Sequence, residues 1–129
     1  MTDLINLGKE LIICKNFKWL PGMSVCLDGE LQDFRVTDVD NRPDSILLIE
    51  HTDDCFIVDH KNGTVTPNLL DPATIGCLLH LVRLAWSDMT ACVVSGGPET
   101  NPWCMIVNDD LLVTAPTEAE VLVRALEEA

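Results

Sequence analysis

The chain has 129 residues, of which 47% are hydrophobic, and its formal net charge at pH 7 is −13. This is the size of one ordinary domain, with enough apolar side chains for a packed core and no apolar run near the ~20 residues that a membrane-spanning helix needs. So negative a surface repels nucleic acid and anionic membranes, which argues against direct binding to either and favours a basic partner. The N-terminal residues are unlike a signal peptide, so we expect a cytoplasmic protein.

The N-terminal part is predicted to form a short helix followed by strands. Apolar residues between Leu4 and Leu11 recur at helical spacing, which indicates a helix over residues 3–13. The Pro21-Gly22 pair is typical of a turn. Strand-like segments follow, and we predict strands at residues 23–27, 34–39, 46–51, 55–59 and 64–66.

The strongest turn signal in this region is Asn62-Gly63, between the last two predicted strands. Asn-Gly adopts two successive positive φ angles at little cost, which suits a tight hairpin. We therefore expect the strand at 55–59 to pair with the one at 64–66, so that the whole region is an antiparallel meander.

The rest of the chain is predicted as helix, three strands and helix. Asp71-Pro72 is an N-cap followed by proline at the first helical position, and the periodicity extends this helix to Trp86. Thr117-Glu-Ala-Glu120 has the form of a capping box that opens a last helix. We expect both helices to pack on one face of an antiparallel sheet. Its strands are predicted at residues 91–95, 103–107 and 111–114.

The predicted fold class is therefore α+β. An N-terminal helix and a small antiparallel β meander are followed by a helix, a three-stranded antiparallel sheet and a C-terminal helix. We assign residues 1–70 to the helix and acidic meander, and residues 71–129 to a helix-sheet-helix sandwich unit, with one domain or two both open.

The six cysteines lie inside apolar runs, and no Cys-x-x-Cys pair occurs. Free cysteine in such a setting packs as a small hydrophobic residue, whereas zinc sites and thioredoxin-like sites need paired spacing. We expect reduced thiols in the core, and we predict no cofactor and no bound metal.

Negative charge is concentrated in residues 28–59. This segment contains ten carboxylates and only two cations, Arg35 and Arg42, so it carries −8 of the total −13. Carboxylates on strands and turns can occupy a site built for phosphates and can determine partner choice. Trp19 lies in a lysine-flanked turn and is added as a contact residue, because tryptophan is enriched at binding hot spots. The other predicted partner-binding residues are Asp28, Glu30, Asp33, Asp38, Asp40, Asp44, Asp53 and Asp54.

Three segments carry a resemblance to a known group of proteins. They are Pro67–Trp86, Trp103-x-x-x-Val107 and Thr117–Ala129, preceded by Trp19-x-Pro21-Gly22-Met23. Together they resemble small phage-encoded proteins of uncharacterised function, some of which are described as phage α/β sandwich domains. The resemblance implies a phage or prophage origin and a location in the host cytoplasm, and it implies no activity.

We therefore expect a phage-encoded, non-enzymatic binding protein. Its acidic β surface would dock on a basic, nucleic-acid-binding surface of a host protein, as an anti-defence inhibitor of the anti-CRISPR kind does. Two alternatives stay open. One is a metal-dependent hydrolase that uses His51, Asp53, Asp59 and His60, brought together across a hairpin. The other is a homo-oligomeric structural or assembly module that associates through an apolar patch or an open sheet edge.

Overall fold

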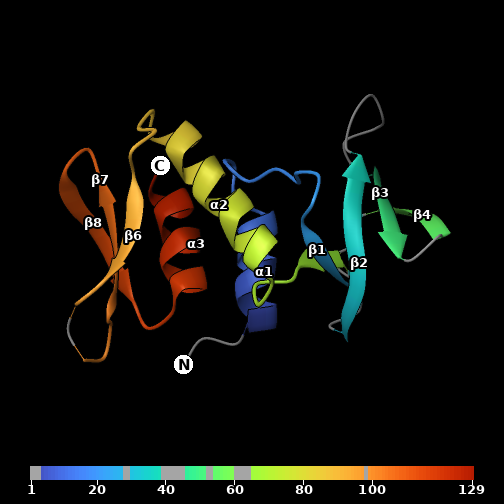
Figure 1. The fold of residues 1–129 in the computed structure, drawn as a ribbon, viewed down its shortest axis with the longest axis horizontal. Coiled ribbons are helices and arrows are strands. Elements are labelled where there is room, and N and C mark those ends of the chain that lie inside the picture. The colour runs from blue at the N-terminus through green and yellow to red at the C-terminus, as the bar shows by residue number, and fades with distance from the viewer. Residues whose placement is uncertain (1–3, 28–29, 39–45, 52–53, 60–64, 98) are drawn as a thin grey trace. The chain divides into compact units, whose positions relative to one another are not determined.

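The computed structural model describes residues 4–27, 30–38, 46–51, 54–59, 65–97 and 99–129 (Figure 1). These residues form three helices and two antiparallel sheets, which confirms the predicted α+β class and the order of its elements. None of the described helices is long and apolar enough to cross a membrane. The chain divides into two compact units, one of residues 18–77 and one of residues 1–17 together with 78–129.

The unit of residues 18–77 is built on a five-stranded antiparallel sheet. Its spatial order is β4-β3-β2-β1-β5. In the acidic strands β2 to β4 the structure describes the backbone and its pairing, together with the side chains of Arg35 and Val36. The strands are β1 (Ser24–Leu27), β2 (Glu30–Asp38), β3 (Ile46–His51), β4 (Asp54–Asp59) and β5 (Val65–Pro67).

The position of β5 corrects the predicted meander. β5 does not pair with β4; it pairs with β1 at the opposite side of the sheet, with Val25 opposite Pro67. All three residues of β5 are buried, so the strand completes the core beside β1. The predicted turn at Asn62-Gly63 lies outside the described residues. An Asn-Gly pair indicates that the chain turns, but burial decides which strand the next segment joins.

The Pro21-Gly22 turn forms as predicted. The Met23 amide donates a hydrogen bond to the carbonyl oxygen of Leu20 at 3.2 Å, and Gly22 has φ +97°. Proline at the second position and a positive φ at the third are the features of a type II turn, and glycine adopts that φ without strain. The Gly22 amide also donates to the Val36 carbonyl at 2.8 Å, which attaches the turn to β2.

The second unit contains α1 (Leu4–Ile12), the sheet β6-β7-β8 and α3 (Glu118–Glu128), while α2 (Pro72–Ala85) runs across the boundary between the units. The strands are β6 (Cys92–Ser95), β7 (Trp103–Val107) and β8 (Asp110–Ala115). α3 contacts all three strands and covers one face of this sheet (Figure 1).

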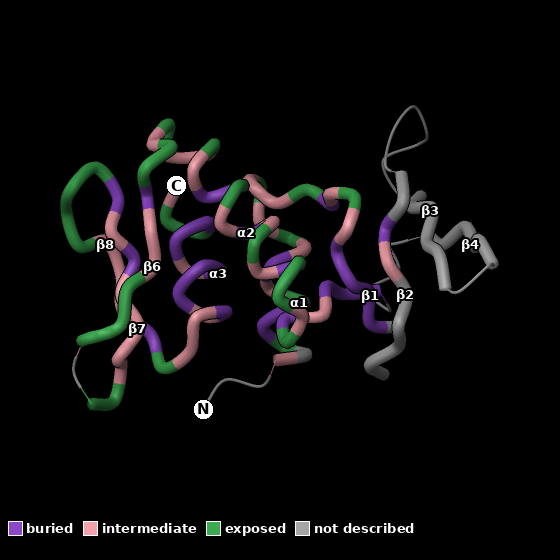
Figure 2. The backbone as a smooth tube through the Cα atoms, in the orientation of Figure 1, coloured by how far each residue is buried: buried purple, intermediate pink, exposed green. Residues whose placement is uncertain are grey.

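α3 is the central element of this unit. Figure 2 shows buried stretches along most of its length, and both Leu122 and Leu126 are fully buried. The Trp86 indole also donates a hydrogen bond to the Ala125 carbonyl of α3 at 2.9 Å, and Asn16 donates to the Leu126 carbonyl at 3.2 Å. A helix covered on several sides must be apolar around much of its surface, as α3 is.

The grouping of α1 differs from the predicted division at residue 70. α1 belongs with residues 78–129 because it contacts α3. An ion pair of 3.0 Å between Glu10 and Arg124 joins the two helices, and Leu7 and Leu11 of α1 are fully buried. Helical periodicity shows which residues of α1 are apolar, but not which distant helix covers them.

Thr117 caps α3 as the capping-box pattern predicts. Its hydroxyl accepts a hydrogen bond from the Glu120 amide at 3.2 Å, and its backbone is extended at φ −132°. We expect Thr117→Ala to lower the free energy of unfolding by about 1 kcal/mol, because the amide loses its partner. Thr117→Ser keeps an acceptor oxygen and should stay within about 0.5 kcal/mol of the wild type. Urea denaturation measures both; equal losses for the two variants would contradict a capping role.

Candidate functional site

The described acidic residues of the segment 28–59 all belong to three neighbouring strands. Glu30, Asp33 and Asp38 lie on β2, Glu50 lies on β3, and Asp54 and Asp59 begin and end β4. These strands are adjacent in the order β4-β3-β2, on the side of the sheet away from β5. Of the other predicted contact residues, Asp28, Asp40, Asp44 and Asp53 lie outside the described residues.

The strand register distributes these carboxyl-bearing positions along the sheet. Asp54 is opposite His51, whereas Asp59 is opposite Ile46. Asp38 is opposite Leu48 and therefore lies toward the Asp59 end of β4. Five residues at about 3.4 Å each separate Asp54 from Asp59 by about 17 Å. The positions thus extend over the length of the strands and do not converge on one point.

This register separates the residues of the alternative metal cluster. His51 and Asp59 were expected to face each other across a hairpin, but they lie at opposite ends of the β3-β4 ladder. Metal ligands lie about 2 Å from a shared ion, which a backbone separation of about 17 Å does not allow. Asp53 and His60 are outside the described residues. Within the described part of the chain, no three His, Cys, Asp or Glu residues gather as metal ligands.

Trp19 is wrongly predicted as a contact residue. Its side chain is buried, with 5% of its surface exposed. The lysine-flanked turn suggested an accessible indole, yet a large aromatic side chain next to a turn gains more by packing into the core. Trp19 is therefore excluded from the candidate surface.

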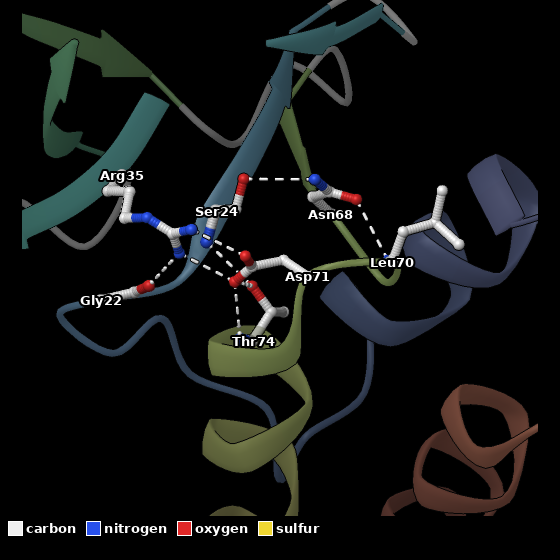
Figure 3. Close-up of polar contacts among 7 residues, drawn as sticks. All are labelled: Gly22, Ser24, Arg35, Asn68, Leu70, Asp71 and Thr74. Atoms are coloured by element: carbon white, nitrogen blue, oxygen red, sulfur yellow. Dashed lines mark hydrogen bonds and ion pairs between the residues drawn. The ribbon is translucent and has the colours of Figure 1, made fainter. Parts of the chain in front are cut away.

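A second group of polar residues joins β2 to the beginning of α2 (Figure 3). The Arg35 guanidinium donates two hydrogen bonds to the carboxylate of Asp71, at 2.7 and 2.8 Å, and one to the Gly22 carbonyl at 2.9 Å. Asp71 also accepts a hydrogen bond from the Thr74 amide at 2.9 Å and therefore caps α2, as predicted. We call Ser24, Arg35, Asp71 and Thr74 the Asp71 cluster.

The hydrogen bonds of the Asp71 cluster form a continuous chain. The buried Thr74 hydroxyl accepts from the Ser24 amide at 2.8 Å and donates to Asp71 at 3.0 Å. Chiefly the hydrogen bonds from Arg35 lower the pKa of Asp71 from 3.8 to about 2, so the carboxylate is charged at neutral pH. Every buried side-chain nitrogen or oxygen in the described residues has a hydrogen-bond partner. The Asp71 cluster is thus a structural connection between sheet and helix.

The sequence signals the Asp71 cluster only in part. The Asp71-Pro72 pair predicts the helix cap, but Arg35 lies 36 residues earlier, and nothing local connects the two. This pairing bears on the acidic strands, because Arg35 is one of only two cations in residues 28–59. Its charge is matched by Asp71, a carboxylate from outside that segment.

The cysteines whose side chains the structure describes are free thiols, namely Cys14, Cys26, Cys77, Cys92 and Cys104. Cys26 is buried, and its burial raises the pKa of its thiol. The other four are only half-buried, so among these five the predicted position in the core applies to Cys26 alone. Cys55 lies on β4, where only the backbone is described.

Comparison with known proteins finds no matching family model, no matching curated protein and no matching solved structure.

Proposed function

We propose that this protein is a non-enzymatic binding protein whose acidic strands β2, β3 and β4 dock on a basic, phosphate-binding surface of a partner protein. The observation that carries the proposal is the adjacency of these three strands, which hold all described carboxyl-bearing positions of the segment 28–59. By the strand pairing, Asp38, Glu50 and Asp59 occupy positions on the same face of these strands, which suits several Lys and Arg side chains better than a single small ion.

The charge balance of the strands supports the same function. Residues 28–59 carry −8, and the guanidinium of Arg35 is engaged by Asp71. A field of one sign speeds association with a surface of opposite sign and weakens as salt screens it. A partner that normally binds nucleic acid offers such a surface, and occupying it would make this protein an inhibitor. A phage origin and action in a host cytoplasm, as the resemblance implies, fit that role.

The test compares two variants with the same change in charge. Asp38→Lys with Asp59→Lys reverses two positions on one face of the acidic strands, whereas Glu99→Lys with Glu128→Lys reverses two exposed carboxylates of the other unit. Immobilised protein is exposed to cell lysate at low and at high salt, and captured proteins are eluted with duplex DNA as a competitor.

We expect the wild type and the Glu99/Glu128 variant to capture the same protein, released by DNA and by high salt. The Asp38/Asp59 variant should retain about tenfold less of it, because it loses two attractive charges and gains two repulsive ones. Equal losses in both variants would show that net charge alone is responsible. Unchanged capture by the Asp38/Asp59 variant would reject the proposal.

A further inference from the structure

The three-stranded sheet of the second unit has a second apolar face. Along β7, the buried residues Met105 and Val107 alternate with Cys104 and Ile106, which are only half-buried. Successive residues of a strand point to opposite faces, and paired residues of neighbouring strands share a face. The pairing therefore defines an outer face, opposite the one that α3 covers. It consists of Cys92, Val94, Cys104, Ile106, Leu111 and Thr114.

The composition of the outer face is unusual for a solvated surface. An antiparallel sheet that is covered on one side normally alternates apolar residues inward with polar residues outward. The outer face instead has no charged residue, although 22% of the chain is charged. Leu111 is 60% exposed and Val94 is 41% exposed. A sheet that is apolar on both faces is typical of one that is covered on both, and exposed apolar patches mark interaction sites.

Carboxylates lie at one end of the outer face. The β7-β8 turn contains Asn108 and Asp109, both with positive φ, and Asp109 and Asp110 are exposed directly before Leu111. The Asp88 carboxylate is held at the same end, where it accepts a hydrogen bond from the Asn108 amide at 2.7 Å. That bond and those from Thr90 lower the pKa of Asp88, so it too is charged.

These charges indicate the chemistry of the partner. A second copy of this chain would bring the same carboxylates and a further net charge of −13 to the contact. A partner with Lys or Arg beside its apolar side chains would be attracted to this end. The inner face of the same sheet already accommodates a helix, α3, which shows the kind of element that fits these strands.

We propose that the outer face binds a basic amphipathic helix of another protein, with its Lys or Arg side chains at the β7-β8 turn. This contact would be separate from the acidic strands, because it lies on the other unit of the chain. The helix would bury Val94, Leu111 and the half-buried residues between them, while its cations would face Asp88 and Asp109.

The probe for this test is a synthetic helical peptide of about five turns, with leucine at i, i+3, i+4 and i+7 and lysine flanking that stripe. A matched peptide carries glutamate in place of lysine. Fluorescence anisotropy with the full chain should show that the lysine peptide binds at least about tenfold more tightly than the glutamate peptide. Absence of binding by the lysine peptide would overturn the proposal.

Two double variants separate the outer face from general attraction to an acidic protein. Val94→Lys with Leu111→Lys changes the outer face, whereas Ile13→Lys with Leu84→Lys changes two exposed apolar residues elsewhere by the same charge. All four side chains are exposed, so both proteins should fold, as circular dichroism would verify. We expect the outer-face pair to weaken lysine-peptide binding at least about tenfold, and clearly more than the control pair.

Two further results bear on the proposal. Asp109→Asn should weaken binding by about twofold at low salt and by less at high salt, because one attractive rim charge is lost. Equal weakening by the outer-face and control pairs would overturn the proposal. So would a doubling of mass with concentration in light scattering that Val94→Lys with Leu111→Lys abolishes, since the occupant would then be a second copy.

Discussion

Asp71→Ala should lower the free energy of unfolding by about 3 kcal/mol at neutral pH, as followed by urea denaturation. The substitution removes two charge-assisted hydrogen bonds from Arg35 and the cap on the Thr74 amide. It also leaves the buried Thr74 hydroxyl without the acceptor to which it donates. Amide exchange at Ser24, whose N–H donates to that hydroxyl, should accelerate as the cluster loosens.

The pH dependence provides a sharper test of the same cluster. The pKa of Asp71 is lowered from 3.8 to about 2 in the folded state. Because the unfolded chain takes up the proton first as the pH falls, the contribution of Asp71 is fully present above pH 4 and is lost as the pH approaches 2. A shift of this size corresponds to about 2 kcal/mol.

Asp71→Asn isolates this contribution, because asparagine has nearly the same shape and no charge. The difference in unfolding free energy between wild type and Asp71→Asn should shrink by about 2 kcal/mol between pH 5 and pH 2. Asp110→Asn, which removes an exposed carboxylate, is the matched control and should show a much smaller change. A difference for Asp71→Asn that stays constant over this range would contradict the bidentate pairing with Arg35.

Leu122→Ala should lower the free energy of unfolding by about 3 kcal/mol, because a fully buried leucine leaves a cavity as well as losing apolar contact. Leu122 has none of its surface exposed and lies on α3, which contacts all three strands of its sheet. Little relaxation can fill the space in a helix packed on several sides. Urea denaturation followed by circular dichroism measures the loss.

Leu111→Ala is the matched control for Leu122→Ala. The same side chain is truncated in the same unit, but Leu111 is 60% exposed, so the change should stay within about 0.5 kcal/mol. Similar losses for the two variants would contradict the central position of α3. The control also bears on the outer face, since it shows whether the fold depends on an apolar residue there.

Much of the local structure follows from the sequence. The α2 cap at Asp71, the α3 cap at Thr117 and the type II turn at Pro21-Gly22 form where their residue types predict. Each depends on hydrogen bonds or φ angles within about four residues, so the neighbouring side chains suffice to specify it. The β3 strand likewise matches its predicted range, Ile46–His51.

The candidate surface was predictable only as a segment of sequence. The concentration of carboxylates in residues 28–59 is visible in the sequence, but the predicted strands contain only three of the ten, Asp38, Glu50 and Asp59. The separation of His51 from Asp59 became known only from the pairing of β3 with β4, which places His51 opposite Asp54 and Ile46 opposite Asp59. The burial of Trp19 depended on what packs around it.

Long-range pairing decided the remainder. β5 joins β1 instead of β4, α1 belongs with the C-terminal helix, and Arg35 pairs with a carboxylate 36 residues away. Caps, turns and periodicity specify elements because their energies come from near neighbours. Which element packs against which depends on how much apolar surface each arrangement buries and how many polar groups it hydrogen-bonds across the whole unit. Only the folded chain shows that choice. The acidic segment is thus a feature of the sequence, whereas its gathering on β2, β3 and β4 is a property of the sheet.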